Sequence, residues 1–564
     1  MLKRNIHRYK KMKKFYKNIT NKIKIRGRWS FIAKAQKTIL SAAFVIALFA
    51  GLSSILGFVK GRMLINFFGV SDELGIFYAA DRVPNMVYSI IVAGAISTIF
   101  IPVFTDLLKK DKKEAWKTAS NVINITLISF LFLGGFLVIF AYPVMNLLSL
   151  GELTPEQLKL GAGLMRIMVG SQLILILSSL LSSILQSHKF FLVPAAAPVL
   201  YNVGMIVGLI ALSGKYGIYA PALGTVVGAA LHLLIQIPLL KKTSFSYVVS
   251  KTLLNKETRK IFSLVPPRIA SVVLTQLSIV VNNSLAILIS PASVVILKSA
   301  SQVQFLPVNI FGASMALASL PVLAEHADTS EHDKFKRIFI TTLHQTAYLV
   351  LPFSALMLVL RVPIVRIVYG VANFPWEATI ETALTLGFFS LSIFSQSVVY
   401  LFTRAFYALK DTTTPVTVSL LTIIINTTLS VFFVHFLRLG VWSLAMSYTI
   451  TSLLDSILLF YKLDRKLNGF ILSEVLVPLI KISTASAMMG VFVYVPMKIL
   501  DLYVLDTSRT IQLIITTGTS AASGLGIYLL LTKLLKVEEV NLFYKLILKI
   551  KPKKTFQEVV SEEQ

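Results

Sequence analysis

The sequence predicts an all-α polytopic membrane protein with about 14 transmembrane helices. Of its 564 residues, 55% are hydrophobic and 14% are charged, which lies outside the composition of soluble globular proteins. Apolar runs of about 20 residues or more, long enough to cross a bilayer, recur along the chain. Most Lys and Arg residues lie in the short segments between these runs and at the two ends.

Each apolar run is predicted to form one span. In chain order the spans are 38–59, 74–104, 119–149, 160–186, 193–213, 217–240, 262–290, 296–324, 339–369, 381–408, 414–437, 439–461, 471–499 and 508–534. Alternate loops are basic, such as KKDKKEAWK and KLDRK, while the loops between them, such as LGELTPEQ and GVANFPWEATIE, hold few Lys or Arg. Because positive loops stay in the cytoplasm, this alternation predicts an even number of spans with both termini cytoplasmic.

The net charge of +29 is also typical of proteins that bind nucleic acid. The placement of the charge in interhelical loops argues against nucleic acid as a partner and for topology signals. Residues 1–37 contain 14 Lys or Arg and no Asp or Glu, so we expect a cytoplasmic extension that lies on anionic lipid. The chain has no Cys, which excludes disulfides, thiolate metal sites and a Cys nucleophile.

An internal repeat divides the apolar part of the chain. YAADRVPNMVYSIIVAGAISTIFIPVF (78–104) aligns with KSASQVQFLPVNIFGASMALASLPVL (298–323), and two later landmarks recur in the same order. The repeat predicts two parallel six-helix lobes around a central cavity, the arrangement of transporters that alternate access by rocking. The expected domains are an N-terminal lobe (38–240), a C-terminal lobe (241–461), two further helices (462–535) and a cytoplasmic tail (536–564).

Several motifs resemble one known family over about residues 40–535. They are SSILGFVKGRMLINFFG (53–69), RVPN…AGAISTIFIPVF (82–104), LVPPRIASVVLTQLSIVVNNSLAILIS (264–290), QFLPVNIFGASMALASLPVLAEHA (304–327) and RAFYALKDTTTPV (404–416). The chain resembles the MurJ/MviN lipid II flippases of the multidrug/oligosaccharidyl-lipid/polysaccharide exporter superfamily.

The resemblance implies a multi-pass protein of the bacterial inner membrane that acts in cell-wall synthesis. Its implied substrate is an undecaprenyl-pyrophosphate-linked peptidoglycan precursor, moved from the inner to the outer leaflet through a cationic cavity. The last two helices would form a groove for the lipid tail. Membrane lipids, cell-wall synthesis proteins and a coupling ion, H⁺ or Na⁺, are the other partners considered.

The sequence departs from the family pattern where that pattern has charges. An Arg of the first helix corresponds to Ser54, and an Arg-Asp pair to Lys60-Gly61. A later Asp corresponds to Gly75, an Arg of the second helix to Tyr88, and an Asp-Arg pair of the eighth helix to Ser301-Gln302.

The candidate substrate-binding residues are charged or polar side chains in or beside apolar spans. Lys60 and Arg62 end the first span, where they could face phosphate or extend to the membrane interface. Asp81 and Arg82 are adjacent and therefore point about 100° apart on a helix. We expect Arg82 to line the cavity and Asp81 to pair elsewhere.

A second group lies in the C-terminal lobe. Arg268, Gln276 and Asn283 fall approximately on one helical face, which is typical of a cavity lining or of interhelical hydrogen bonds. Arg268 is also placed to act as a positive-inside anchor. Lys298 begins the next helix, one turn before Gln302, where it could supply the charge missing from Gln302.

No motif for catalysis occurs, and we expect neither an enzyme nor a metal or cofactor site. The chain has no Walker-type loop, no GxSxG and only scattered His residues. Transport would therefore depend on the membrane potential or an ion gradient, with Asp81, Glu381 and Asp455 as candidate ion-binding acids.

Two other functions stay open at this point. One is a different exporter of the superfamily, either a polysaccharide-lipid flippase or a cation-coupled drug exporter, which the altered cavity charges favour. The other is a membrane scaffold that does not transport, against which the retained Arg62, Arg82 and Arg268 argue. A membrane glycosyltransferase is weaker, because no acidic catalytic loop lies on the outer face.

Overall fold

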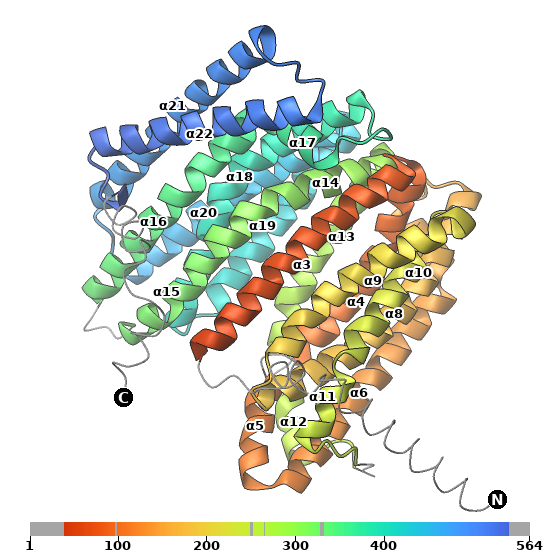
Figure 1. Cartoon of the computed structure of the whole chain (residues 1–564). Coiled ribbons are helices and arrows are strands. Elements are labelled where there is room, and N and C mark those ends of the chain that lie inside the picture. Colours follow the sequence, from red (N-terminus) through yellow and green to blue (C-terminus); the bar gives the residue numbers. More distant parts are fainter. Residues whose placement is uncertain (1–38, 96–98, 249–251, 264–265, 328–331, 541–564) are drawn as a thin grey trace, which may run out of the picture. The chain divides into compact units, whose positions relative to one another are not determined.

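The computed structural model of the protein describes residues 39–95, 99–248, 252–263, 266–327 and 332–540 (Figure 1). Every regular element in these residues is a helix, and no strand occurs among them. The predicted all-α class is therefore confirmed. The basic extension expected at residues 1–37 lies outside the described residues.

Thirteen helices in the described part of the chain are long and apolar enough to cross a membrane. They are Leu48–Phe68, Lys112–Ile139, Pro155–Ser187, Leu192–Tyr216, Tyr219–Thr243, Val272–Ile289, Pro291–Glu325, His332–Val359, Trp376–Ala408, Thr413–Phe436, Trp442–Lys466, Leu472–Tyr503 and Thr510–Leu534. In chain order they overlap 13 of the predicted spans.

The remaining predicted span, 74–104, contains α4 (Asp72–Ala95) and α5 (Ile101–Lys110). Of these two, α4 is long enough to span but is not among the 13 apolar helices. It carries acidic and basic residues that lower its hydropathy, among them Asp81 and Arg82. It therefore needs polar neighbours inside the protein.

The chain divides into two compact units. The first comprises Met1–Met63, Ala80–Val144 and Lys159–Val273, and the second Leu64–Ala79, Met145–Leu158 and Leu274–Gln564. The predicted lobes, 38–240 and 241–461, remain predictions.

The first unit consists of helices linked mostly by short loops (Figure 1). They are α3 (Ile39–Phe68) as far as Met63, α4 from Ala80, α5, α6 (Lys112–Ile139), α8 (Pro155–Ser187) from Lys159, α9 (Leu192–Tyr216), α10 (Tyr219–Leu234), α11 (Ile237–Leu240), a 3₁₀ turn (Lys241–Thr243), α12 (Lys256–Ser263) and the start of α13 (Pro266–Ile289).

The second unit holds the end of α3, the starts of α4 and α8, most of α13 and the rest of the chain. Its further elements are the second half of α7 (Ala141–Leu148, from Met145), α14 (Pro291–Pro307), a π-helical segment (Val308–Ala313), α15 (Ser314–Glu325), α16 (His332–Val359), α17 (Arg361–Tyr369), α18 (Trp376–Ala408), α19 (Thr413–Val431), a second π-helical segment (Phe432–Phe436), α20 (Trp442–Lys466), α21 (Leu472–Tyr503) and α22 (Thr510–Leu534).

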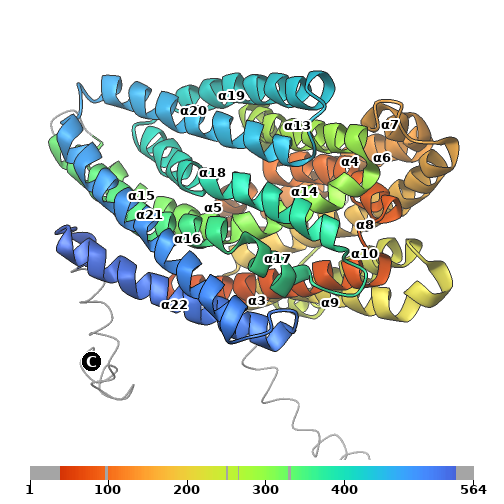
Figure 2. The same cartoon turned by 90° about the horizontal axis from the view of Figure 1, so that it is seen from above.

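The core of the second unit forms around α18, which contacts α14, α15, α16 and α20 (Figure 2). Buried Phe339, Phe402 and Phe406 belong to this core. A second core joins α16 to the paired helices α21 and α22, where the Tyr528 hydroxyl donates to the carbonyl of Tyr348 at 2.7 Å. Burial of apolar side chains thus attaches the last two helices to this unit.

In the first unit, α9 and α10 pack with their backbones in close contact through paired glycines. A Cβ atom added at Gly204 would lie 2.5 Å from the Cα of Gly228, and one at Gly208 would lie 2.5 Å from the Cα of Gly224. Glycines four residues apart on both helices form the small-residue contact common between transmembrane helices. This contact also fixes the position of Tyr201, whose carbonyl meets Gly228.

Substitution of Gly208 tests this contact. We expect Gly208→Ala to lower the unfolding free energy by about 1–3 kcal/mol, because the added methyl overpacks the interface. Gly214→Ala on the same helix should have little effect or stabilise slightly, because nothing lies within 4 Å of its added Cβ. Thermal unfolding of the purified protein in detergent measures both, and equal melting temperatures would contradict the close contact.

A charged cap begins α19. Asp411 accepts hydrogen bonds from the backbone amides of Thr413 and Thr414, and Lys466 Nζ donates to its Oδ2 at 2.6 Å. Burial alone would raise the pKa of this carboxyl, but the bonds from Lys466 and Thr414 outweigh burial and lower the pKa to about 2. The cap therefore links the loop before α19 to the end of α20.

The lowered pKa of Asp411 predicts a pH-dependent contribution to stability. The contribution should be complete above the unfolded pKa of about 4 and be lost as the pH falls from about 4 to about 2. Asp411→Asn keeps the capping oxygen but removes the charge, whereas Asp411→Ala removes both and should cost about 1–2 kcal/mol at neutral pH. Unfolding measured against pH would contradict this account if wild type and Asp411→Asn differed equally at pH 7 and pH 2.

Candidate functional site

A polar cluster built around Lys60 lies within the first unit. The half-buried Lys60 on α3 places its Nζ 5.7 Å from the centroid of the Tyr201 ring on α9. Asp81 on α4 is close enough to interact electrostatically with both groups. A cation between a carboxylate and an aromatic face is stabilised by both, which offsets the cost of removing it from water.

One face of α4 carries the polar partners of this cluster. Asp81, Asn85 and Tyr88 follow one another at helical spacings of four and three residues and so share a face. The Asn85 side chain donates to Asp81 Oδ2 at 3.0 Å, and the Tyr88 hydroxyl is bonded to Ser179 Oγ on α8 at 2.9 Å. Tyr88, where the family pattern has an Arg, thus makes a neutral contact with a neighbouring helix.

Asn202 fixes α3 against α9 next to the cluster. Its Nδ2 donates to Ser53 Oγ at 3.0 Å and to the Ser53 carbonyl at 3.2 Å. Asn202 directly follows Tyr201, so this bond and the glycine contact with α10 both help to hold the aromatic ring beside Lys60.

The other predicted basic residues of this unit point elsewhere. Arg82 is half-buried and lies about 100° around α4 from Asp81. Arg62 is half-buried two residues beyond Lys60 and so faces almost the opposite side of α3. The structure therefore brings Lys60 and Asp81 together, and the expected cavity roles of Arg62 and Arg82 stay predictions.

Lys298 belongs to a separate group in the second unit. Its Nζ lies 5.9 Å from the centroid of the Tyr78 ring, near the start of α4. Gly75 lets the backbone of α4 come close to the start of α14, because a Cβ there would lie 1.8 Å from the carbonyl oxygen of Pro291. Asp72 Oδ1 also accepts from the amide of Ala292 at 3.2 Å, which attaches the start of α4 to the start of α14.

The predicted stripe on α13 is only partly described. Arg268 lies in the first turn of α13, but its side chain lies outside the described residues. Gln276 is half-buried, and the buried Asn283 donates to the carbonyl of Ile279 in its own helix. The neighbouring Asn282 makes an interhelical bond, in which its side chain donates to Asn426 Oδ1 at 3.2 Å.

Asn282 joins a neutral network between α13, α19 and α20. Ser430 Oγ contacts Asn282 at 3.4 Å and Ser447 Oγ at 2.6 Å. Asn426 Nδ2 donates to Ser447 and Thr451 Oγ atoms at 3.4 and 3.3 Å. The network contains no carboxylate, so it connects helices by hydrogen bonds rather than by charge.

Two glutamines follow Lys298 along α14. Gln302 is half-buried, whereas Gln304 is fully buried and neither polar atom of its amide has a hydrogen-bond partner in the described residues. An unsatisfied buried amide destabilises a helix bundle, and this one lies next to the π-helical segment that begins at Val308.

The candidate ion-binding acids occupy unlike surroundings. Asp81 lies within electrostatic reach of Lys60, Glu381 is exposed on α18, and Asp455 is half-buried on α20 with no partner for Oδ1 in the described part of the chain. Within the described residues, no group of three or more His, Cys, Asp or Glu could hold a metal ion.

Several functional-site partners had no clear signal in the sequence. Tyr201, Asn85 and Ser179 contact the cluster from apolar stretches, and Asn426 is one of many polar residues in an apolar span. A polar residue inside a span is a weak signal. Which two meet depends on how the helices pack.

Comparisons with known proteins agree with this architecture. A probable lipid II flippase MurJ from Buchnera aphidicola is 26% identical over 90% of this chain and 99% of the relative. One from Borreliella burgdorferi is 28% identical over 72% and 80%. The solved structure of lipid II flippase MurJ in its inward closed conformation has a TM-score of 0.72 and 23% identity, covering 87% of this chain and 98% of that chain.

The family model described as lipid II flippase MurJ matches residues 64–511, which is most of the chain. Members are multi-pass inner-membrane transporters rather than enzymes of a catalytic family. The 13 apolar helices of the described residues fit that class. The chain belongs to the lipid II flippase MurJ family.

Proposed function

We propose that this protein moves lipid II, the undecaprenyl-pyrophosphate-linked peptidoglycan precursor, from the inner to the outer leaflet by alternating access. The match to the flippase family over residues 64–511 supports the substrate class. The Lys60 cluster is the structural observation that supports a site for an anionic head group. The proposal includes no catalytic step and no ATP hydrolysis.

The physical argument rests on the cost of charges inside a membrane. A Lys or Arg at the centre of a span costs about 2.5–3.5 kcal/mol on insertion scales, so such residues are retained where they have a task. Lys60, Arg62 and Arg82 bring positive charge to the first unit, where a pyrophosphate would accept charge-assisted hydrogen bonds. Asp81 orients Lys60 and limits the excess charge when the site is empty.

The orientation and the energy source are further parts of the proposal. The basic loops support cytoplasmic termini, so that the substrate enters from the cytoplasmic leaflet. Asp81 and Asp455 are candidate sites for a coupling proton or sodium ion. Glu381 is a weaker candidate, because its side chain is exposed near the start of α18.

A second candidate is export of another lipid-linked saccharide by the same mechanism. The neutral bond between Tyr88 and Ser179, at a position where the family has an Arg, favours a head group with less negative charge. Growth of a strain that depends on lipid II transport separates the two candidates, because only a lipid II flippase should restore it.

Complementation is the direct test of the proposed function. Expression of the chain in a strain depleted of its own lipid II flippase should restore growth. Arg82→Ala should abolish this rescue, because the half-buried guanidinium on α4 is proposed to bind the pyrophosphate. Lys110→Ala, at the exposed end of α5, is the matched control and should leave growth unchanged.

The outcomes separate clearly if membrane levels of each variant are measured alongside growth. Failure of the well-expressed wild-type chain to rescue would contradict lipid II as the substrate. Equal growth of the Arg82→Ala and Lys110→Ala strains would remove Arg82 from the binding site.

A further inference from the structure

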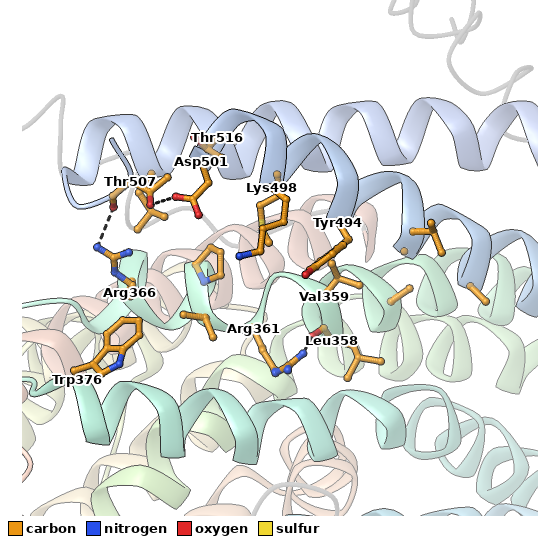
Figure 3. Close-up of a pocket in the computed structure, with 18 residues that line it drawn as sticks. Leu358, Val359, Arg361, Arg366, Trp376, Tyr494, Lys498, Asp501, Thr507 and Thr516 are labelled. Carbon is orange, nitrogen blue, oxygen red and sulfur yellow. Dashed lines mark hydrogen bonds between the residues drawn. The ribbon is translucent and has the colours of Figure 1, made fainter. Parts of the chain in front are cut away.

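A cavity of about 770 Å³ lies within the second unit, between α16, α17, α21 and the start of α22 (Figure 3). It is separate from the Lys60 cluster, and every residue that lines it belongs to the second unit. Most of its wall is apolar, with side chains such as Leu358, Val359 and Val491. It is large enough to hold part of an alkyl chain.

Three basic side chains line the cavity. Arg361 and Arg366 come from the first and last turns of α17, and Lys498 comes from α21 on the opposite side (Figure 3). Asp501 is the one acidic residue among those that line it, and its Oδ1 accepts a hydrogen bond from Thr507. The lining therefore has an excess of positive charge.

Each of the two arginines uses some of its N–H groups to bond a backbone carbonyl, which holds its side chain in place. Arg361 Nη1 donates to the carbonyl of Leu358 at 2.8 Å. Arg366 Nη2 donates to the carbonyl of Thr507 at 2.9 Å, and its guanidinium lies 5.9 Å from the centroid of the Trp376 ring. A guanidinium has five N–H donors, so further donors stay available for an anion.

Two other polar groups face this cavity without protein partners. The exposed ammonium of Lys498 has no hydrogen bond or ion pair with the described residues. Thr516 on α22 is 1% exposed, and its hydroxyl has no hydrogen-bond partner in the described part of the chain. A buried hydroxyl that lines a cavity and lacks a partner leaves one hydrogen bond open to a ligand.

The surroundings define the kind of ligand. Around the cavity, Val491, Leu502 and Tyr503 expose 60%, 67% and 81% of their surface, as expected for helices that face lipid. Trp376 and Tyr494 are also exposed, which is typical of the membrane interface. A bare anion would leave the apolar wall uncovered, whereas a lipid with an anionic head group would satisfy both parts.

We propose that this cavity binds an anionic membrane glycerophospholipid, its phosphate between Arg361, Arg366 and Lys498 and an acyl chain along the apolar wall. Such a lipid would brace α21 and α22 against α17. The inference goes beyond the proposed function and does not depend on which lipid the protein transports.

Quenching of tryptophan fluorescence by brominated lipids tests this site. The protein is placed in phosphatidylcholine nanodiscs with brominated phosphatidylglycerol or, at the same mole fraction, brominated phosphatidylcholine. Trp376 reports on the cavity, so the anionic lipid should quench more strongly, and this preference should disappear in Trp376→Phe. Loss of one basic residue should reduce the relative association constant about fivefold.

The variants separate head-group binding from folding. Lys498→Gln, at an exposed side chain, should reduce the preference for the anionic lipid. The double variant with Arg361→Gln and Lys498→Gln should abolish this preference. Lys481→Gln is the control on the same helix, α21: this half-buried lysine does not line the cavity, so the variant should retain the preference. Arg366 is left unchanged because it also holds the loop at Thr507 and Ser508.

Equal quenching of the wild type by the two lipids would overturn the proposal. So would a preference that survives in Lys498→Gln at wild-type strength, or one that persists in Trp376→Phe. None of these outcomes bears on whether the chain complements a flippase-depleted strain.

Discussion

A charge inside a membrane-spanning helix needs partners that replace water, and this constraint explains the arrangement of the first unit. Lys60, Asp81 and Tyr201 come from three helices and stabilise one another electrostatically. The hydrogen bond between Asn202 and Ser53 and the glycine contact between α9 and α10 keep these helices in place. The small residues in the helix contacts thus help to hold the partners that replace water around the charged residues.

The second unit meets the same constraint without buried charge pairs in its described network. Asn282, Asn426, Ser430, Ser447 and Thr451 form neutral hydrogen bonds between α13, α19 and α20. Neutral groups are less costly to bury than ions, so this region is suited to holding helices together. Three basic side chains of this unit, Arg361, Arg366 and Lys498, line the cavity beside α17 and α21.

Most of the helices could be predicted from the sequence, because an apolar run is a local property. The predicted spans 381–408 and 471–499 correspond to α18 and α21 within a few residues. The run 119–149 is broken at Phe140 into α6 and α7, and 296–324 contains a π-helical segment. These breaks depend on packing and backbone geometry that hydropathy does not record.

The site could be predicted only in part for the same reason. Lys60 and Asp81 are recognisable as charges at the edges of apolar runs, but only the structure brings the two within electrostatic reach of each other. Tyr201 could not be paired with Lys60, because their contact depends on the packing of α3 against α9. On α13, Asn283 fits the expected helical face, but Asn282 makes the bond to α19, since adjacent residues differ by about 100° in direction.

Equilibrium binding of purified lipid II to the detergent-solubilised protein is the most direct test of the central claim, that the Lys60 cluster binds the anionic head group. Lys60→Gln should raise the Kd about tenfold, because a charge-assisted bond is lost and Asp81 loses its cationic neighbour. Lys110→Gln should bind as the wild type does. A Kd for Lys60→Gln within about twofold of wild type, far below the roughly tenfold loss expected for one charge-assisted bond, would contradict the account.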